Sequence, residues 1–459
     1  MRSLKAPETA IELHQLRGSL EGGVPAAMVT CDPSGMPNVT LASQVYYVDA
    51  RHVALSFQFF NKTYQNIRRN PLACVQLIDP VTGATHRLHL RYMRTETEGP
   101  LFESMRAQLA GIASHLGMAD VYSLRGSDVY AVEEIEAVQG DTLPAAPLRQ
   151  GLLTALRQIS ERLARCATLD ELVDSVLDSL VELAGVQHAM VLINEAPSGG
   201  AAANGTLFTV GSIGYVDSGV GSEVRMGDGV IGMAAAACTP VRINRVSPAS
   251  SYNHIVRRET QSEQPGLVVD IDIPFPGLTE PHSQLAVPLM AGGLTLGVLF
   301  VESARELAFG FEDEDLLMSV AALLGASIGM LRGQEEQVSA PPKTSQPSAT
   351  AVPALTVKHY AINNSVFVDD VYLIKGVAGA ILWRLLRDHA ADKRTQFTNR
   401  ELRLDAGLGL PDVDDNLEAR LLLLRRRLEE KSPHIYLERA GRGCISLHVE
   451  RPLVLLEVS

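Results

Sequence analysis

Residues 37–79 read PNVTLASQVYYVDARHVALSFQFFNKTYQNIRRNPLACVQLID, and this stretch decides the fold of the first part of the chain. β-Branched and aromatic residues fill most of it, and turn residues such as those at 49–51 divide it into short runs. A short helix is expected between Asn61, which caps it, and Pro71, which stops it. Strands are expected at 37–48, 52–60 and 73–78, after an earlier one at 25–31. The pattern predicts the meandering strands of a barrel.

The helix start at Lys62 and Thr63 is a candidate phosphate site. The first backbone N–H groups of a helix have no partner within it, and the positive end of the helix dipole lies there. The Lys62 ammonium and the Thr63 hydroxyl would add two donors. An ordinary solvated helix start has the same local sequence, so these residues alone leave both interpretations open.

The same stretch resembles the pyridoxamine 5′-phosphate oxidase-like flavin-binding split barrel, whose strands lead to a Ser/Asn-Lys-Thr helix start, an Asn-Pro pair and a further strand. The resemblance covers about residues 10–138. It implies FMN at a dimer interface, with the phosphate held by Lys62 and Thr63. The residues that it implies beside the isoalloxazine ring are Asn38, Val39, Thr40, Phe57, Gln58, Phe59 and Gln76.

Haem is the alternative cofactor, because relatives of this barrel also bind haem or deazaflavin. His86, His89 and His115 are candidate haem ligands, although a lone histidine in an antiparallel sheet is more often a surface or hydrogen-bonded residue. Beyond Asp79 the chain has an amphipathic helix in place of the Arg/Trp-rich segment that reads pyridoxine phosphate in the oxidase itself. Oxidation of pyridoxamine is therefore not expected.

A second domain is expected from residue 151 to residue 333. It resembles a GAF sensor domain, on the segment LRQISERLARCATLDELVDSVLDSLVELAGVQHAMVLI at 156–193, the turn at 226–232, and SQLAVPLMAGGLTLGVLFVES at 283–303. The resemblance implies an antiparallel sheet flanked by long helices, and a small-molecule pocket covered by the loop at 244–282. Neither a cyclic-nucleotide signature nor a bilin-type Cys-His pair is evident, so the ligand is unidentified and a domain without a ligand stays open.

The last part of the chain resembles the winged helix of OmpR-type response regulators over about residues 355–449. Short strands precede three expected helices, and a hairpin with its tip at 440–443 follows them. LEARLLLLRRRLEE at 417–430 takes the place of the family's recognition helix. Leu422 and Leu423 depart from that family, which usually has polar or basic residues there. The candidate DNA contacts are Arg420, Arg425, Arg426, Arg427 and Arg442.

These boundaries predict a multidomain α+β chain: an N-terminal split β-barrel at 1–140, a central GAF α/β sensor domain at 151–333, a flexible linker at 334–353 and a C-terminal winged helix at 354–459. Two prolines mark the first boundary, and Pro, Ser, Thr and Gln dominate the linker.

Charge is spread unevenly over the 459 residues. The net charge is −13, from 40 Lys+Arg against 53 Asp+Glu. Residues 353–459 hold 16 Lys+Arg against 15 Asp+Glu, which leaves 24 against 38 for the rest. The acidic part would repel nucleic acid, so any contact with DNA must come from the last domain.

The sequence also indicates where the protein functions. The apolar run at 320–331 is too short to cross a bilayer, which needs roughly 20 residues, and the first residues lack the apolar core of a secretory signal. The 5 cysteines are far apart and never form CxxC, which argues against a disulfide framework or a zinc site. We expect a cytoplasmic protein with buried thiols and no membrane partner.

Three functions are compatible with these features. The first is a homodimeric, ligand- or redox-sensing transcription regulator, in which the barrel and the GAF domain sense and the winged helix binds DNA. The second is a flavin-dependent oxidoreductase regulated by its other two domains, although no acid/base or nucleophile constellation is apparent. The third is a cofactor-free scaffold that uses the winged fold for protein contacts.

Overall fold

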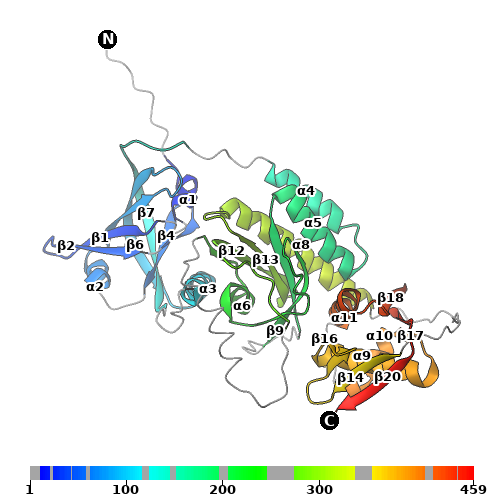
Figure 1. Ribbon diagram of the computed structural model, residues 1–459. Helices are drawn as coiled ribbons and strands as arrows, with labels where there is room; N and C mark the ends of the chain where they lie inside the picture. The colour runs from blue at the N-terminus through cyan, green and yellow to red at the C-terminus, as the bar shows by residue number, and fades with distance from the viewer. Residues whose placement is uncertain are drawn as a thin grey trace.

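The structure is a computed structural model. It describes residues 11–20, 24–42, 44–57, 62–115, 124–144, 151–195, 205–244, 273–335, 354–408, 417–441 and 443–458. Three bodies follow one another along the chain, with the barrel at one end, the second domain in the middle and the C-terminal region at the other end (Figure 1).

The barrel consists of one seven-stranded sheet with the order β2-β1-β5-β6-β7-β4-β3. Its elements are β1 (Ala26–Cys31), β2 (Pro37–Ala42), β3 (Val45–Asp49), β4 (His52–Phe57), α2 (Lys62–Arg69), β5 (Leu72–Ile78), β6 (Thr85–Glu96), α3 (Pro100–His115) and β7 (Gly126–Val138), after η1 (Leu13–Leu16) and α1 (Arg17–Leu20). β2 and β3 lie at opposite edges although only residues 43 and 44 separate them, so the sheet must curl until its edges approach. The single strand expected at 37–48 is therefore two strands, whereas the split barrel itself is confirmed.

The second domain has a six-stranded sheet with the order β10-β9-β8-β13-β12-β11. Its elements are α4 (Leu152–Leu163), α5 (Leu169–Ala184), β8 (His188–Asn194), β9 (Thr206–Ile213), β10 (Glu223–Arg225), α6 (Gly229–Ala237), β11 (Val241–Ile243), β12 (Ser283–Ala291), β13 (Leu294–Ser303) and α8 (Phe311–Glu335). α5 begins where the sequence predicts, because the Thr168 hydroxyl accepts the N–H of Glu171 at 3.1 Å. The predicted antiparallel sheet with long flanking helices is confirmed.

Helix α8 is longer than the apolar run at 320–331. Among the described residues, its segment Phe311–Leu331 is the one that could span a membrane by length and composition alone. However, Leu317, Val320 and Leu324 are buried, and the helix packs against β12 and α4. This is the packing of a core helix on a sheet.

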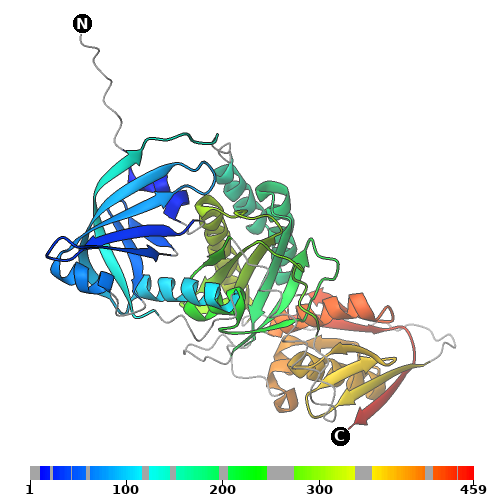
Figure 2. The ribbon, with the colours of Figure 1, turned by 60° about the vertical axis from the view of Figure 1, so that its left-hand side comes forward.

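The barrel helix α3 joins the barrel to the second domain. It packs on α6 and β11 (Figure 2). Ala107 lies in the same apolar cluster as Val230 of α6 and Phe300 of β13. A Cβ on Gly111 would lie 2.6 Å from a methyl carbon of Val241, so only glycine permits this approach. Helix α3, which replaces the Arg/Trp-rich segment of the oxidase, therefore packs against the neighbouring domain.

The C-terminal region has more strands than helices among its described residues. Its elements are β14 (Leu355–Tyr360), β15 (Ser365–Val368), β16 (Val371–Ile374), α9 (Gly376–Asp392), β17 (Gln396–Thr398), α10 (Asn399–Leu404), η3 (Ala406–Leu408), α11 (Leu417–Lys431), β18 (Ile435–Gly441), β19 (Cys444–Val449) and β20 (Leu453–Val458). Two sheets form, β16-β15-β14-β20 and β17-β19-β18. A further strand that was not predicted, β20, runs parallel to β14. The expected short strands, helices and hairpin occur in order, but their order does not identify a DNA-binding domain.

Candidate functional site

The first residues of α2 form a small polar site beside the turn that joins β1 and β2. The Thr63 hydroxyl accepts a hydrogen bond from the Asn38 amide at 2.8 Å. The Lys62 ammonium lies 3.5 Å from the Asp32 carboxylate. The hydroxyl of Ser34, two backbone N–H groups and the Lys62 charge lower the pKa of Asp32 to about 2, so Asp32 is ionised. The Lys62 ammonium can therefore bind a phosphate or another anion only if it leaves the Asp32 carboxylate.

Strand alternation separates the predicted ring contacts into two sets. Asn38 and Thr40 lie opposite the buried Thr30 and Met28, on the inner face of the sheet beside α2. Val39 is exposed on the outer face. Gln76 pairs with Ala27 and shares that outer face. One flat ring cannot contact both sets from within a single barrel.

Several predicted residues lie outside the described part of the chain. They are Gln58, Phe59 and Arg442, and the side chains of Phe57 and His115; the linker prediction also falls almost wholly outside it. Of the remaining haem candidates, His86 and His89 are three residues apart on β6 and so face opposite sides of the strand. His89 lies 3.5 Å from Glu136. These two histidines do not form a shared ligand site.

A buried acid inside the barrel was not predicted. Asp128 of β7 is buried, and its carboxylate accepts the Thr95 hydroxyl at 2.5 Å. Tyr92 continues this chain with a 2.7 Å contact to the Thr95 hydroxyl. Burial raises the pKa of Asp128 to about 6, against the lowering effects of Thr95 and the Arg68 charge. An Asp two residues after a glycine at a strand start is the only sequence signal, and it is too common to identify such a group.

A second buried polar cluster lies on the sheet face of the GAF-like domain that α6 covers. Glu302 is 1% exposed and accepts the Gln284 side-chain amide at 2.9 Å and the Leu278 N–H at 2.7 Å. Burial raises the pKa of Glu302, and burial together with the neighbouring Glu302 raises the pKa of Tyr215. The Tyr215 ring lies 5.3 Å from the ring of His188. The signal for this cluster was the glutamate that ends the apolar strand GVLFVES.

The arginines of α11 are not presented to solvent. Arg420 and Arg427 are 4% and 5% exposed. Arg420 lies 3.7 Å from Glu195, and Arg427 donates to the Leu373 carbonyl of its own domain at 3.0 Å. Leu422 and Leu423 are buried as well. In this arrangement the predicted DNA contacts on α11 are engaged within the protein, and their role on DNA stays a prediction.

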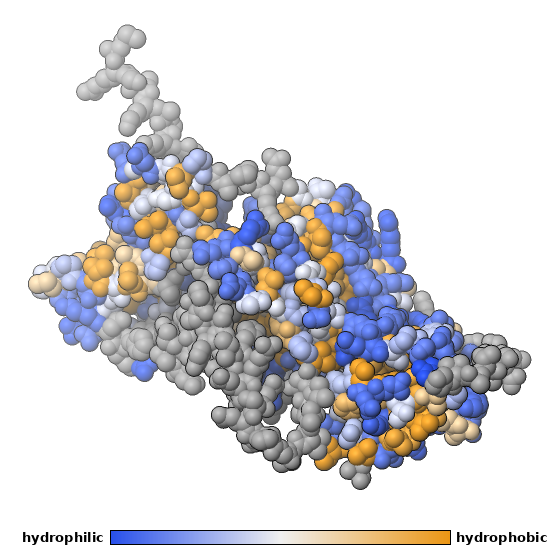
Figure 3. Space-filling model, in the orientation of Figure 1, coloured by the Kyte–Doolittle hydropathy of each residue, from blue (hydrophilic) through white to orange (hydrophobic). Residues whose placement is uncertain are grey.

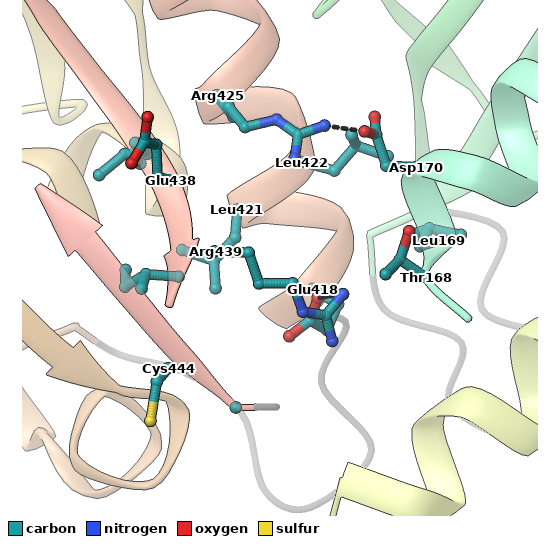
Figure 4. A pocket seen from close by; sticks show the side chains of 13 residues that line it. Thr168, Leu169, Asp170, Glu418, Leu421, Leu422, Arg425, Glu438, Arg439 and Cys444 are labelled. Carbon is teal, nitrogen blue, oxygen red and sulfur yellow. Dashed lines mark ion pairs between the residues drawn. The ribbon is translucent and has the colours of Figure 1, made fainter. Parts of the chain in front are cut away.

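Arg425 and Arg426 reach across to α5. Arg425 forms an ion pair with Asp170 (Figure 4). Arg426 donates to Asp170 at 2.8 Å, to Asp174 at 2.6 Å and to the Val210 carbonyl at 2.8 Å. Burial would raise the pKa of Asp170, but the hydrogen bonds from both arginines more than offset this and hold it below its usual value.

A cavity of about 70 Å³ lies beside these pairs, between α5, α11 and the β18–β19 hairpin (Figure 4). Thr168, Leu422, Arg425 and Arg439 line part of it. A wider open groove adjoins it and includes Asp174 and Glu430. The small cavity is lined by both polar and apolar side chains and is large enough for a few water molecules.

Two family models match the chain. Residues 14–139 match "Pyridoxamine 5'-phosphate oxidase", and residues 166–328 match "GAF domain". The chain therefore contains a pyridoxamine 5′-phosphate oxidase-like split barrel followed by a GAF domain. Both matches end before the C-terminal region.

Solved structures resemble the two matched parts. An FMN-binding protein from Syntrophomonas wolfei is 14% identical, with 28% of this chain and 86% of that chain covered and a TM-score of 0.25. The GAF domain of a phosphoenolpyruvate-protein phosphotransferase from Coxiella burnetii is 18% identical, with 40% and 97% covered and a TM-score of 0.30. Free methionine-R-sulfoxide reductase from Neisseria meningitidis is 18% identical, with 42% and 96% covered and a TM-score of 0.30. No curated protein matches the chain.

Asp128 predicts a pH dependence of barrel stability. The folded pKa of about 6 lies above the ordinary value of 3.8, so the unfolded chain loses its proton first as the pH rises. Stability should fall between about pH 4 and pH 6, by up to about 2–3 kcal/mol, and level off above that range. Asp128→Asn, which keeps an acceptor for Thr95, should lack this fall. Hydrogen exchange of β6 and β7 amides in urea measures it; equal pH profiles for both proteins would contradict the assignment.

Proposed function

We propose that the protein is a cytoplasmic, ligand- or redox-sensing transcriptional regulator that binds FMN in its split barrel and DNA through its C-terminal domain. A split barrel and a GAF domain in one chain support ligand sensing. The observation that carries the proposal is the direct packing of α11, the expected DNA-reading helix, on α5 and β9 of the GAF domain. A sensor that contacts the output helix can change its availability.

The C-terminal domain is proposed to be a winged helix. In its support, α9, α10 and α11 follow one another, and the hairpin β18–β19 pairs with β17 from between α9 and α10. A small three-stranded sheet beside three helices is the arrangement that such a domain requires. Its candidate contacts with phosphates remain the α11 arginines and Arg442 at the hairpin tip.

FMN is the proposed cofactor, with haem as the alternative. Lys62 and Thr63 would hold the phosphate at the start of α2, where two donors meet the positive end of the helix. A bound flavin would supply reversible redox chemistry. The protein's own contribution is the Lys62 ammonium, which pairs with Asp32 and would pair with the phosphate instead when FMN binds.

The FMN prediction compares phosphorylated and unphosphorylated ligands. Lys62→Ala should weaken FMN binding roughly tenfold or more, the size of a lost hydrogen bond to a charged group, and leave riboflavin binding unchanged. Asp32→Asn should strengthen FMN binding because it frees Lys62, whereas Asp49→Asn, the matched control in another turn, should have no effect. Equilibrium fluorescence titration measures the affinities of the four proteins for FMN and for riboflavin. An unchanged FMN-to-riboflavin ratio in Lys62→Ala would refute the site.

The protein is proposed to be a homodimer, with the outer face of β2 in the interface. Val39 and Leu41 are exposed on that face and Met36 is exposed in the turn before it, and apolar residues gather at that end of the barrel (Figure 3). Contiguous apolar surface of this kind marks an association site. The Val39 and Gln76 side of the sheet would then face the partner subunit.

The dimer prediction uses two leucines with the same exposure. Leu41→Glu should yield monomers, because it places a charge in the apolar interface. Leu404→Glu is the matched control, since Leu41 and Leu404 are both 74% exposed; it should remain dimeric. Light scattering at micromolar concentration gives the masses. A wild-type monomer would disprove the dimer, and a dimeric Leu41→Glu variant would disprove the interface.

The DNA prediction concerns the salt dependence of binding. Wild type should bind promoter DNA from its own locus at low salt, and the affinity should fall steeply with salt because each neutralised phosphate contributes a slope of about −0.9. Arg442→Ala should weaken binding and reduce the slope by about one such step. Arg157→Ala on α4 removes the same charge far from the C-terminal domain and should change neither. Fluorescence anisotropy measures both quantities. If neither the apo protein nor the FMN-loaded protein binds DNA, the regulator hypothesis is wrong and the flavin-dependent oxidoreductase hypothesis takes its place.

A further inference from the structure

The GAF domain carries an acidic notch that receives one side chain of α11. The notch consists of the carboxylates of Asp170 and Asp174, the carbonyl of Val210 and the bare backbone of Gly211. Arg426 fills it and is hydrogen bonded through all three guanidinium nitrogens. A Cβ on Gly211 would lie 2.5 Å from the Arg426 Nη1 and 2.6 Å from a methyl carbon of Val173, so the glycine leaves room for both side chains.

The rest of the contact fits the same helix face. Leu423 packs beside Gly221, and Leu422 lines the cavity next to Thr168. The Ser218 hydroxyl donates to Glu430 one turn further along. Leu422, Leu423, Arg426 and Glu430 are spaced as one stripe of an α-helix. This stripe of α11 therefore packs on the GAF domain, whereas Leu417, Leu424 and Leu428 pack in the core of the C-terminal domain.

DNA and the notch compete for the same groups. A phosphate or a base edge would need the Arg426 donors, which are directed at Asp170, Asp174 and Val210. It would also approach a surface that carries the Asp174 and Glu429 carboxylates, which repel a phosphate. The helix cannot enter a major groove while it lies on α5. The groove is about 12 Å wide and admits one α-helix, so it leaves no room for a second helix packed on the first.

We propose that the acidic notch of the GAF domain is a docking site for Arg426, and that docking masks α11 from DNA. The docking claim rests on the contacts of Arg426 described above. The masking claim rests on the DNA-binding function proposed for the C-terminal domain, so the two claims are tested by separate measurements.

Asp174→Asn is the decisive variant. Asp174 is exposed on its outer side, so the change removes a charge without opening the GAF core. Asp178→Asn, one turn further along α5, is the matched control because it is an exposed aspartate on the same helix. The double variant Asp170→Asn/Asp174→Asn gives the larger perturbation. All are made in the full chain.

Hydrogen–deuterium exchange tests docking without DNA. The amides of 211–222 and 417–431 should exchange faster in Asp174→Asn, and faster again in the double variant, while β12 and β13 and the Asp178→Asn control stay as in wild type. Unchanged exchange in both segments of the double variant would overturn the docking site. Equally fast exchange in the control would overturn the role of the notch.

Anisotropy with promoter DNA then tests masking. Asp174→Asn should bind about tenfold more tightly than wild type, the size expected when a charge-assisted hydrogen bond in the masked state is reduced to a neutral one, and Asp178→Asn should match wild type. Faster exchange with unchanged, measurable DNA affinity would overturn masking and keep docking. Faster exchange with no DNA binding by any variant would support docking, refute the proposed function and remove masking with it.

Discussion

A single guanidinium determines how the C-terminal domain sits on the GAF domain. Arg426 is largely buried, and a buried charge is tolerated only when its donors find acceptors. Asp170 and Asp174 from α5 and the Val210 carbonyl from β9 supply them. Because those acceptors come from two elements of the GAF sheet layer, the arginine fixes both the distance and the rotation of α11 against that layer.

The GAF sheet is the common support of the whole chain. On one face it carries α6, with α3 of the barrel packed against α6 and β11. On the other face lie α5 and α8, and α11 of the C-terminal domain packs on α5 and β9. The apolar core on the α5 side runs without a break into the C-terminal domain, through residues such as Val173, Leu177 and Leu422. A change of packing at either outer domain therefore has a physical route to the sheet between them.

How far the sequence could predict this arrangement depends on the range of each interaction. The barrel, the start of α2 and the antiparallel GAF sheet follow from local periodicity and capping residues, and the family models confirm both domains. The sequence also shows that the predicted ring contacts cannot all lie on one face of the sheet, because Asn38 and Val39 are neighbours on a strand and must face opposite sides. Asp170 and Asp174, in contrast, lie about 250 residues before Arg426, and no local pattern connects them.

The run Arg425-Arg426-Arg427 shows what charge patterning alone does not determine. Successive residues of a helix point about 100° apart, since 3.6 residues make one turn, so three adjacent arginines point in three different directions. In the structure Arg426 enters the GAF notch and Arg427 bonds to the Leu373 carbonyl of its own domain. Likewise, Leu421–Leu424 fill two sides of the helix, which indicates two buried faces rather than one.

The two buried faces of α11 differ in kind. Leu417, Leu424 and Leu428, which face the helix's own domain, are completely buried, and the neighbouring elements α9, β16 and β18 continue that core. The GAF-facing stripe mixes two leucines with ion pairs and adjoins a small cavity. Contacts that mix polar and apolar groups in this way are typical of domains that move relative to one another. If α11 leaves the GAF domain, it therefore keeps its own core intact, and the C-terminal domain separates as one body.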